Sequence, residues 1–164
     1  MRLDFETGQF RDCLPTSERT VSDLAPIWKK APPEGDRRVV YRTYGLPGHD
    51  REDPELLYAS TVIEPGHVED EFFMTRGHFH IKPERGEWML TLRGEGALVL
   101  RDRAGNAWTE ALAPGRVHLI PGHLAHRVVN TGSEPLAFVV TWLADCGHDY
   151  ETIACEGFGL HLLA

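Results

Sequence analysis

The segment Gly77–Gly94, which reads GHFHIKPERGEWMLTLRG, is the part of the chain that most restricts its fold. It places His78 and His80 two residues apart, so on a strand both imidazoles point to the same face. The charged KPERG that follows has Pro and Gly near its two ends, which is typical of a turn. A second strand, EWMLTL, begins at Glu87. We expect it to fold back antiparallel to the first and to place the Glu87 carboxylate beside the two imidazoles.

Two imidazoles and one carboxylate that face one cavity form part of a site for a divalent transition metal. His126, in the stretch HLAHRVVN, is the residue that we expect to complete this site. Fe²⁺, Mn²⁺, Co²⁺, Ni²⁺ and Zn²⁺ all accept such a donor set, which leaves positions open on an octahedral ion. With 9 histidines in the chain one match means little, so the hypothesis depends on His78, His80, Glu87 and His126 together. Glu84, four residues after His80, is the alternative carboxylate.

Composition restricts the class of protein. The chain has 164 residues, of which 41% are hydrophobic and 9% aromatic, and this suits one globular domain with a sizeable core. The formal net charge of −8 argues against nucleic acid or an anionic membrane as partner. Since no apolar run has the length of a bilayer span or of a signal core, we expect a cytoplasmic protein. Cys13, Cys146 and Cys155 match no zinc spacing and fit a reducing compartment.

From Val39 onward the sequence predicts strands almost throughout, separated by turns that contain Gly and Pro. The predicted strands cover 39–44, 56–63, 71–75, 78–81, 87–92, 96–102, 107–112, 116–121, 126–130 and 136–143. Many short strands of similar spacing indicate an all-β, single-domain sandwich or barrel. We expect the barrel core at about 39–150 and an N-terminal extension at 1–38. That extension contains the one predicted helix, Thr20–Lys30, with Ser22 as its cap.

Several motifs are similar to those of a known family. GHFH, then Glu87 seven residues after the second histidine, then PGHLAHRVVNTG, resemble the two motifs of cupins. DFETG at Asp4–Gly8, STVIEPG at Ser60–Gly66 and GHDY at Gly147–Tyr150 narrow the resemblance to the cupin-type phosphoglucose isomerases of archaea and some bacteria. The resemblance implies a double-stranded β-helix, or jelly-roll barrel, with DFETG at its edge. It also implies a homodimer, in which we expect residues 4–10 to form the contact.

The same resemblance implies that the protein interconverts D-glucose 6-phosphate and D-fructose 6-phosphate. It implies one divalent metal ion per chain, Fe²⁺ or Mn²⁺ before Zn²⁺, Ni²⁺ or Co²⁺, and it selects Glu87 over Glu84 as the carboxylate ligand. A divalent ion can lower the energy of an enediolate, while a carboxylate above carbons 1 and 2 carries the proton between them. We assign this base role to Glu87. Direct hydride transfer is the alternative route.

The remaining site residues follow from the resemblance alone. His148 has an expected catalytic role, and the expected substrate-binding residues are Tyr41, Thr61, Thr75, Gly77 and Tyr150. Hydroxyls and backbone amides can bind a phosphate without a formal cation, and Arg76 either helps or faces solvent. Met89 and His123 stand where related sequences carry tyrosines, so two fewer hydroxyls orient the substrate here.

Two other classes of function are compatible with a cupin. A metal-dependent cupin oxygenase would use the same ligands with O₂ at an open position, and a non-enzymatic sugar-binding cupin would need no complete ligand set. GHDY and the threonines favour the isomerase over the oxygenase, because an oxygenase needs no phosphate pocket. The four intact ligand positions argue against the binding protein. The expected partner is therefore a small sugar phosphate.

Overall fold

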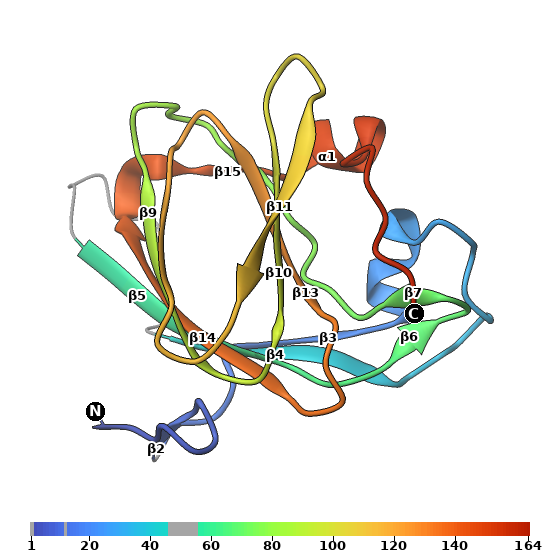
Figure 1. Cartoon of the computed structure of the whole chain (residues 1–164), viewed down its shortest axis with the longest axis horizontal. Coiled ribbons are helices and arrows are strands. Elements are labelled where there is room, and N and C mark those ends of the chain that lie inside the picture. Colours follow the sequence, from blue (N-terminus) through green and yellow to red (C-terminus); the bar gives the residue numbers. More distant parts are fainter. Residues whose placement is uncertain (1, 12, 46–55) are drawn as a thin grey trace.

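The computed structural model describes residues 2–11, 13–45 and 56–164, which form mostly strands (Figure 1). The larger sheet is antiparallel and has the order β12-β9-β14-β5-β4-β3. Its strands are β3 (Ser17–Thr20), β4 (Val39–Gly45), β5 (Leu56–Ile63), β9 (Glu87–Arg93), β12 (Val117–Ile120) and β14 (Leu136–Leu143). The smaller sheet has the order β11-β10-β13 and consists of β10 (Gly96–Arg101), β11 (Ala107–Leu112) and β13 (Ala125–Asn130).

Shorter strands pair two by two at the margins of these sheets. The pairs are β1 (Arg2–Leu3) with β2 (Phe10–Arg11), β6 (His67–Val68) with β7 (Glu71–Phe72), and β8 (Phe79–His80) with β15 (His148–Asp149). Three short helices complete the described part of the chain, namely the 3₁₀ helices η1 (Ser22–Ile27) and η2 (Ala144–Cys146) and the α-helix α1 (Tyr150–Glu156). The all-β prediction is confirmed.

Both main sheets contribute to one hydrophobic core. Val40 and Ile63 of the larger sheet and Leu98 and Val128 of the smaller sheet are all buried in it. Full burial of a side chain of this size contributes about 1.5–3 kcal/mol relative to its exposure.

The helix predicted at Thr20–Lys30 is wrong in type and extent. The structure has a 3₁₀ helix, and Ser22 does not cap it, because its hydroxyl donates instead to the Asp36 carbonyl, 2.9 Å away. Asp23 accepts hydrogen bonds from the backbone N–H and the hydroxyl of Thr20, at 2.8 and 2.7 Å. Pro26 lies inside the helix and lacks the N–H that a longer α-helix would need.

The sequence analysis did not identify the helix α1. Asp149 caps this helix by accepting hydrogen bonds from Thr152, at 3.0 Å from the backbone N–H and 2.6 Å from the hydroxyl. The two bonds lower the pKa of the Asp149 carboxyl. Ile153 is the buried residue of the helix, so the apolar face is too narrow for a periodic signal.

The predicted hairpin between 78–81 and 87–92 is also wrong. β8 pairs with β15, whereas β9 lies between β12 and β14. The segment between the two strands contacts η2 instead, where the Asp145 carboxylate accepts from Lys82 Nζ at 2.8 Å and from Arg85 Nη2 at 2.9 Å. The turn is thereby held against η2 and does not close a tight hairpin.

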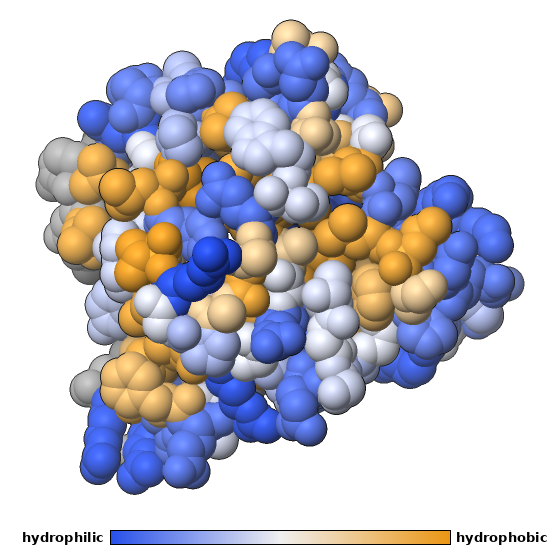
Figure 2. Space-filling view, in the orientation of Figure 1, coloured by the Kyte–Doolittle hydropathy of each residue, from blue (hydrophilic) through white to orange (hydrophobic). Residues whose placement is uncertain are grey.

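The surface is apolar in places. On the face shown in Figure 2, hydrophobic residues gather in a band across the middle, with hydrophilic residues above and below it. Over the whole described surface, the exposed large apolar side chains include Phe5, Leu14, Leu56, Ile81 and Leu119. Within residues 2–11, 13–45 and 56–164, none of the helices has the length and apolar character to cross a bilayer.

Candidate active site

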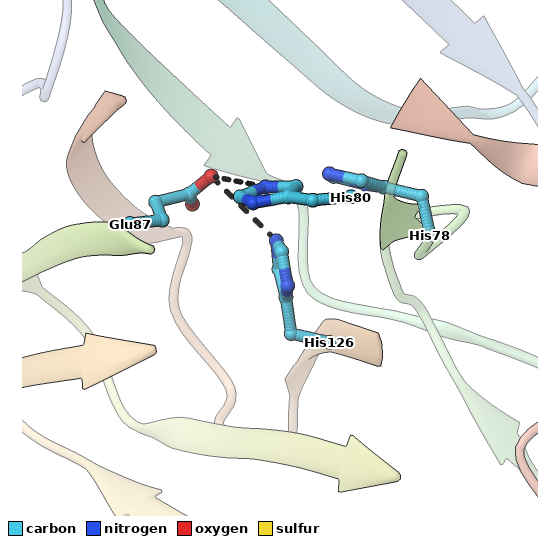
Figure 3. A group of neighbouring side chains, drawn as sticks. All are labelled: His78, His80, Glu87 and His126. Carbon is cyan, nitrogen blue, oxygen red and sulfur yellow. Dashed lines mark ion pairs between the residues drawn. The ribbon is translucent and has the colours of Figure 1, made fainter. Parts of the chain in front are cut away.

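The structure brings together the four residues that the sequence singles out as metal ligands. His80 lies on β8 with His78 just before it, Glu87 opens β9 and His126 lies on β13. One donor atom from each of the four lies within 4.8 Å of every other (Figure 3). Glu87 Oε2 is 3.6 Å from Nε2 of both His80 and His126, as the dashed lines in Figure 3 mark.

Backbone pairing explains why these side chains meet. His78 and His126 form an isolated antiparallel bridge, with N–O distances of 3.3 and 3.1 Å in the two directions. Residues opposite each other in a bridge send their side chains to the same face, so the two rings lie with centroids 4.4 Å apart. The prediction that His78 and His80 share a face is confirmed, since their rings stack with centroids 5.4 Å apart.

The hydrogen bonds of the histidines leave the Nε2 atoms of His78 and His80 available to bind a metal. His80 Nδ1 lies 2.6 Å from the Arg85 carbonyl oxygen; a carbonyl accepts only, so Nδ1 carries the proton and Nε2 is a lone-pair donor. The Nε2 atoms of His78 and His80 are buried and have no hydrogen-bond partner among the described residues. Unpaired buried nitrogens cost about 1–3 kcal/mol each unless a ligand satisfies them.

The ionisation states suit a divalent cation. Burial lowers the pKa of His78 well below its ordinary value, with the neighbouring His126 and His148 adding to the effect, so this imidazole is neutral. Burial opposes ionisation of Glu87, but His126, with His80 and His78, more than offsets it and holds the Glu87 pKa below its ordinary value. Three nitrogens and one carboxylate, in a buried position, fit a first-row divalent ion.

A charged clamp outside the site supports this arrangement. The Asp145 carboxylate binds Lys82 and Arg85, and hydrogen bonds from Arg85 and then Lys82 lower its pKa to about 2. The clamp fixes the Arg85 carbonyl, which in turn fixes the orientation and tautomer of the His80 ring. Such indirect support orients metal ligands in many proteins.

His78, Glu87 and His126 line a cavity of about 560 Å³, and His80 is fully buried beside them. All of the predicted substrate and catalytic residues line it, namely Tyr41, Thr61, Thr75, Gly77, Glu87, His148 and Tyr150. The His148 ring packs against His78 with centroids 4.4 Å apart, and Tyr150 follows at 5.2 Å from His78. Of the competing positions, Glu84 is exposed on the turn and is absent from the cluster, and His123 is exposed as well.

Thr75 and Thr61 present hydroxyl protons to the cavity. The Thr75 hydroxyl accepts a hydrogen bond from the Val128 N–H at 3.0 Å, so its own proton remains to be donated. Thr61 and Thr43 lie with their hydroxyl oxygens 3.3 Å apart. Since one of them donates to the other, one proton of the pair is left for an anion.

Two arginines at this cavity supply positive charge for a phosphate, although the net charge of the protein is negative. Arg76 lies over the Tyr150 ring, with Cζ 4.8 Å from the ring centroid, and both it and Arg19 line the cavity. Burial raises the pKa of Tyr41 and Tyr150, so both phenols stay protonated and can donate. Sequence reasoning missed Arg19. The register of β3 with β4, which pairs Arg19 with Tyr41, is what places it at the cavity.

Arg127 is a second residue that the sequence analysis missed. It is 4% exposed, its Cζ lies 4.5 Å from the centroid of the Phe158 ring, and its Nη2 donates to the Arg76 carbonyl at 2.8 Å. Burial lowers the pKa of this guanidinium to about 10, so it is charged at neutral pH. Arg127 therefore supports, from outside the cavity, the backbone that carries Arg76 and Gly77.

Position 77 requires glycine for two reasons, which are its backbone conformation and the aromatic ring that packs against it. Its φ is +75°, and a Cβ built there would lie 2.6 Å from the Phe158 ring. Gly77→Ala is expected to cost about 2–5 kcal/mol of unfolding free energy, the sum of left-handed strain and overpacking. Gly115→Ala is the matched control, because its φ is +82° with no atom within 4 Å of the added Cβ. It should cost only about 1–2 kcal/mol.

Urea unfolding of the two glycine variants separates the two causes. Equal losses would mean that the contact with Phe158 does not restrict position 77. Two further cavity residues are apolar or aromatic. Met89 is 1% exposed, and Trp142 is half-buried at the cavity, with its ring 6.2 Å from that of His148.

Sequence comparison identifies relatives along most of the chain. A family model described as glucose-6-phosphate isomerase (GPI) matches residues 18–162. The glucose-6-phosphate isomerase of Thermococcus litoralis is 41% identical over 164 residues, covering 96% of this chain and 85% of that protein. That of Pyrococcus furiosus is 40% identical with the same coverage. A putative glucose-6-phosphate isomerase 2 of Rhizobium meliloti is 31% identical, covering 95% and 80%.

Solved structures with a similar fold come from oxalate decarboxylases. A variant of the Bacillus subtilis enzyme OxdC aligns with a TM-score of 0.52 and 24% identity, covering 74% of this chain and 30% of that one. The Lactobacillus farciminis enzyme gives 0.52 and 22%, covering 67% and 30%. At this identity the likeness concerns the fold alone, and it agrees with the predicted cupin barrel. From the family match and the identities of its relatives, the chain belongs to the cupin-type glucose-6-phosphate isomerase family.

Proposed function

We propose that this chain interconverts D-glucose 6-phosphate and D-fructose 6-phosphate with one divalent metal ion held by His78, His80, Glu87 and His126. The observation that carries the proposal is one cavity lined both by members of this cluster and by hydroxyl and cationic donors suited to a phosphate. We favour Fe²⁺ or Mn²⁺ on the resemblance to the cupin-type isomerases, because the donor set itself accepts all five candidate ions. The relatives give no support to the oxygenase or the sugar-binding alternative.

The two ends of the cavity have different tasks in this proposal. Thr75, Thr61 and Tyr41 donate hydrogen bonds to the phosphate, and Arg76 and Arg19 supply local positive charge. Positive charge inside the cavity outweighs the negative net charge of the protein, because salt largely screens charges that lie more than about 10 Å away. The phosphate is thereby fixed, and carbons 1 and 2 of the sugar face the histidine cluster.

Glu87 is the proposed base. When bound, a divalent ion supplies positive charge that stabilises an enediolate. The Glu87 carboxylate removes the proton from carbon 2 of the aldose and returns it to carbon 1, which converts the aldose to the ketose. Glu87 is buried at the cavity. Bulk water therefore has little access to its carboxylate, and the proton is lost to solvent only slowly. In this scheme His148, at the cavity beside His78, takes the proton from the hydroxyl on carbon 2 and gives one to the oxygen on carbon 1, so that hydroxyl and carbonyl exchange places.

A coupled enzymatic assay tests the proposed activity. Metal-free protein should be inactive with fructose 6-phosphate, and activity should return when Mn²⁺ or Fe²⁺ is added. Protein that is folded and reloaded with each of the five candidate ions, yet converts neither sugar phosphate, would refute the isomerase.

An isotope experiment distinguishes proton transfer from hydride transfer. Glucose 6-phosphate that carries deuterium at carbon 2 is converted in ordinary water, and the product is analysed by NMR. Proton transfer through Glu87 should lose part of the label to solvent, since the carboxylate exchanges its proton during some turnovers. A hydride shift would move all of the label to carbon 1. Complete retention over many turnovers, together with a Glu87→Gln variant that holds its metal and stays active, contradicts the role of Glu87 as base.

We also propose that the chain, a single domain with residues 1–38 as an extension, acts as a cytoplasmic homodimer through residues 4–10. The exposed Phe5 and Leu14, at 68% and 88% exposure, support this contact because apolar side chains of that size gain from being covered. Light scattering at micromolar concentration should give twice the chain mass, and Phe5→Asp should shift it toward the monomer. A monomeric wild-type chain would contradict the dimer, and Leu119→Asp, at an exposed apolar position on β12, serves as control.

A further inference from the structure

A second group of metal-binding side chains lies beside the first and shares one residue with it. Donor atoms of His80, Cys146 and His148 lie within 4.8 Å of one another, the same spread as in the four-residue cluster. Cys146 Sγ is 4.0 Å from His148 Nε2, and the rings of His80 and His148 lie with centroids 5.9 Å apart. A tetrahedral ion holds its ligands roughly 3.5 Å apart. Shifts of about an ångström would therefore close this group on an ion.

The backbone holds the three side chains in this arrangement. His80 and His148 are directly opposite each other in the β8–β15 pair. The carbonyl of Cys146 accepts from the Lys82 N–H at 2.9 Å, and the carbonyl of Gly147 accepts from the Ile81 N–H at 3.3 Å. Cys146 itself is fully buried. The thiol therefore faces the two imidazoles as part of the pairing that brings β8 to the cavity.

We infer that His80, Cys146 and His148 form a binding site for soft divalent cations such as Cd²⁺, and that an ion there excludes an ion from the four-residue site. Thiolate is the soft ligand that selects such cations, whereas Mn²⁺ and Fe²⁺ suit the nitrogen and carboxylate donors. His80 can bind only one ion, because its Nδ1 is committed to the Arg85 carbonyl and Nε2 is the single donor left. The two sites therefore compete for that atom.

The consequence is inhibition by soft cations. As the metal–sulfur bond forms, the S–H bond of Cys146 breaks and its proton leaves to solvent. His80 is withdrawn from the four-residue set and His148 is occupied. This consequence rests on the proposed function, but the binding site itself does not.

Cadmium spectroscopy on a single-thiol protein tests the site. Cys13→Ser/Cys155→Ser leaves Cys146 as the only thiol, since the chain has 3 cysteines. Cd²⁺ added to this metal-free protein should produce a thiolate-to-cadmium charge-transfer band that saturates at one equivalent. Adding Cys146→Ser should abolish the band, and His148→Ala should weaken Cd²⁺ binding by about tenfold or more. Mn²⁺ affinity, measured by electron paramagnetic resonance of the free ion, should be unchanged by Cys146→Ser within about twofold.

Two outcomes would overturn the inference. A single-thiol protein without the band would show that Cys146 is not a cadmium ligand, and a protein that retains both a full complement of Mn²⁺ and the band would show that the sites do not compete. Circular dichroism and thermal unfolding of Cys146→Ser and of a second variant, Cys146→Ala, show whether each remains folded. Loss of the band in a folded variant then reports the missing thiol and not unfolding. A protein that shows the band but fails the isomerase assay keeps this site and refutes only the proposed activity.

Discussion

Glu87→Gln is expected to lower kcat by ~10²-fold or more, because the amide keeps the size of the side chain but cannot take a proton from carbon 2. Glutamine also removes the negative charge of the four-residue set, so metal binding should weaken as well. Metal content, measured by mass spectrometry, must therefore accompany the rate, and kcat should be compared at full occupancy. Loss of rate in a fully loaded variant isolates the role as base.

Glu84→Gln is the matched control for this change. Glu84 lies three residues earlier on the exposed turn, outside the cluster, so the same chemical change there should leave kcat within about twofold. An active, fully loaded Glu87→Gln that also retains the whole deuterium label would transfer the hydrogen by another route. A large loss in Glu84→Gln would instead restore Glu84 as a candidate for the carboxylate.

His126→Ala should reduce metal content sharply, with apparent affinity lower by about a hundredfold or more, since even partners that only orient a ligand are worth 10–100-fold. The backbone bridge between His78 and His126 does not depend on the imidazole, so the barrel should remain folded. Metal per chain after dialysis, with circular dichroism alongside, measures both effects.

His123→Ala controls for the loss of any histidine in the same segment. Its side chain is exposed and absent from the described cavity and cluster, so metal content should match that of the wild type. Full occupancy in His126→Ala would remove His126 from the ligand set. A loss in both variants would point to disruption of the segment 123–126 and not to ligation.

Short-range patterns predicted most of the strands and the position of the cluster. His78 and His80 share a face because strand geometry alternates every second residue, and that rule needs no knowledge of the rest of the chain. Pairing partners are different: β8 pairs with β15, 68 residues later in the His80–His148 register. The choice of partner depends on contacts between segments that are far apart in sequence, which a local pattern does not contain.

The residues that sequence reasoning missed share this non-local origin. Arg19 reaches the cavity because β3 extends the larger sheet beside β4, and Arg127 supports Gly77 because Phe158 covers it from the C-terminal segment. Neither residue belongs to a motif, and both are of a type that is usually a solvated surface side chain. Their positions follow from packing between segments that are far apart in sequence.

The placement of Glu87 and His126 on different sheets has a consequence for heat resistance. Glu87 belongs to the larger sheet and His126 to the smaller one, so an ion bound by both would join the two halves of the barrel as a cross-link. A ligand bound only by the native state adds about 4 kcal/mol of stability at a concentration one thousand times its dissociation constant. The melting temperature should therefore follow the supply of metal, and cells short of the ion would lose the protein itself as well as its activity.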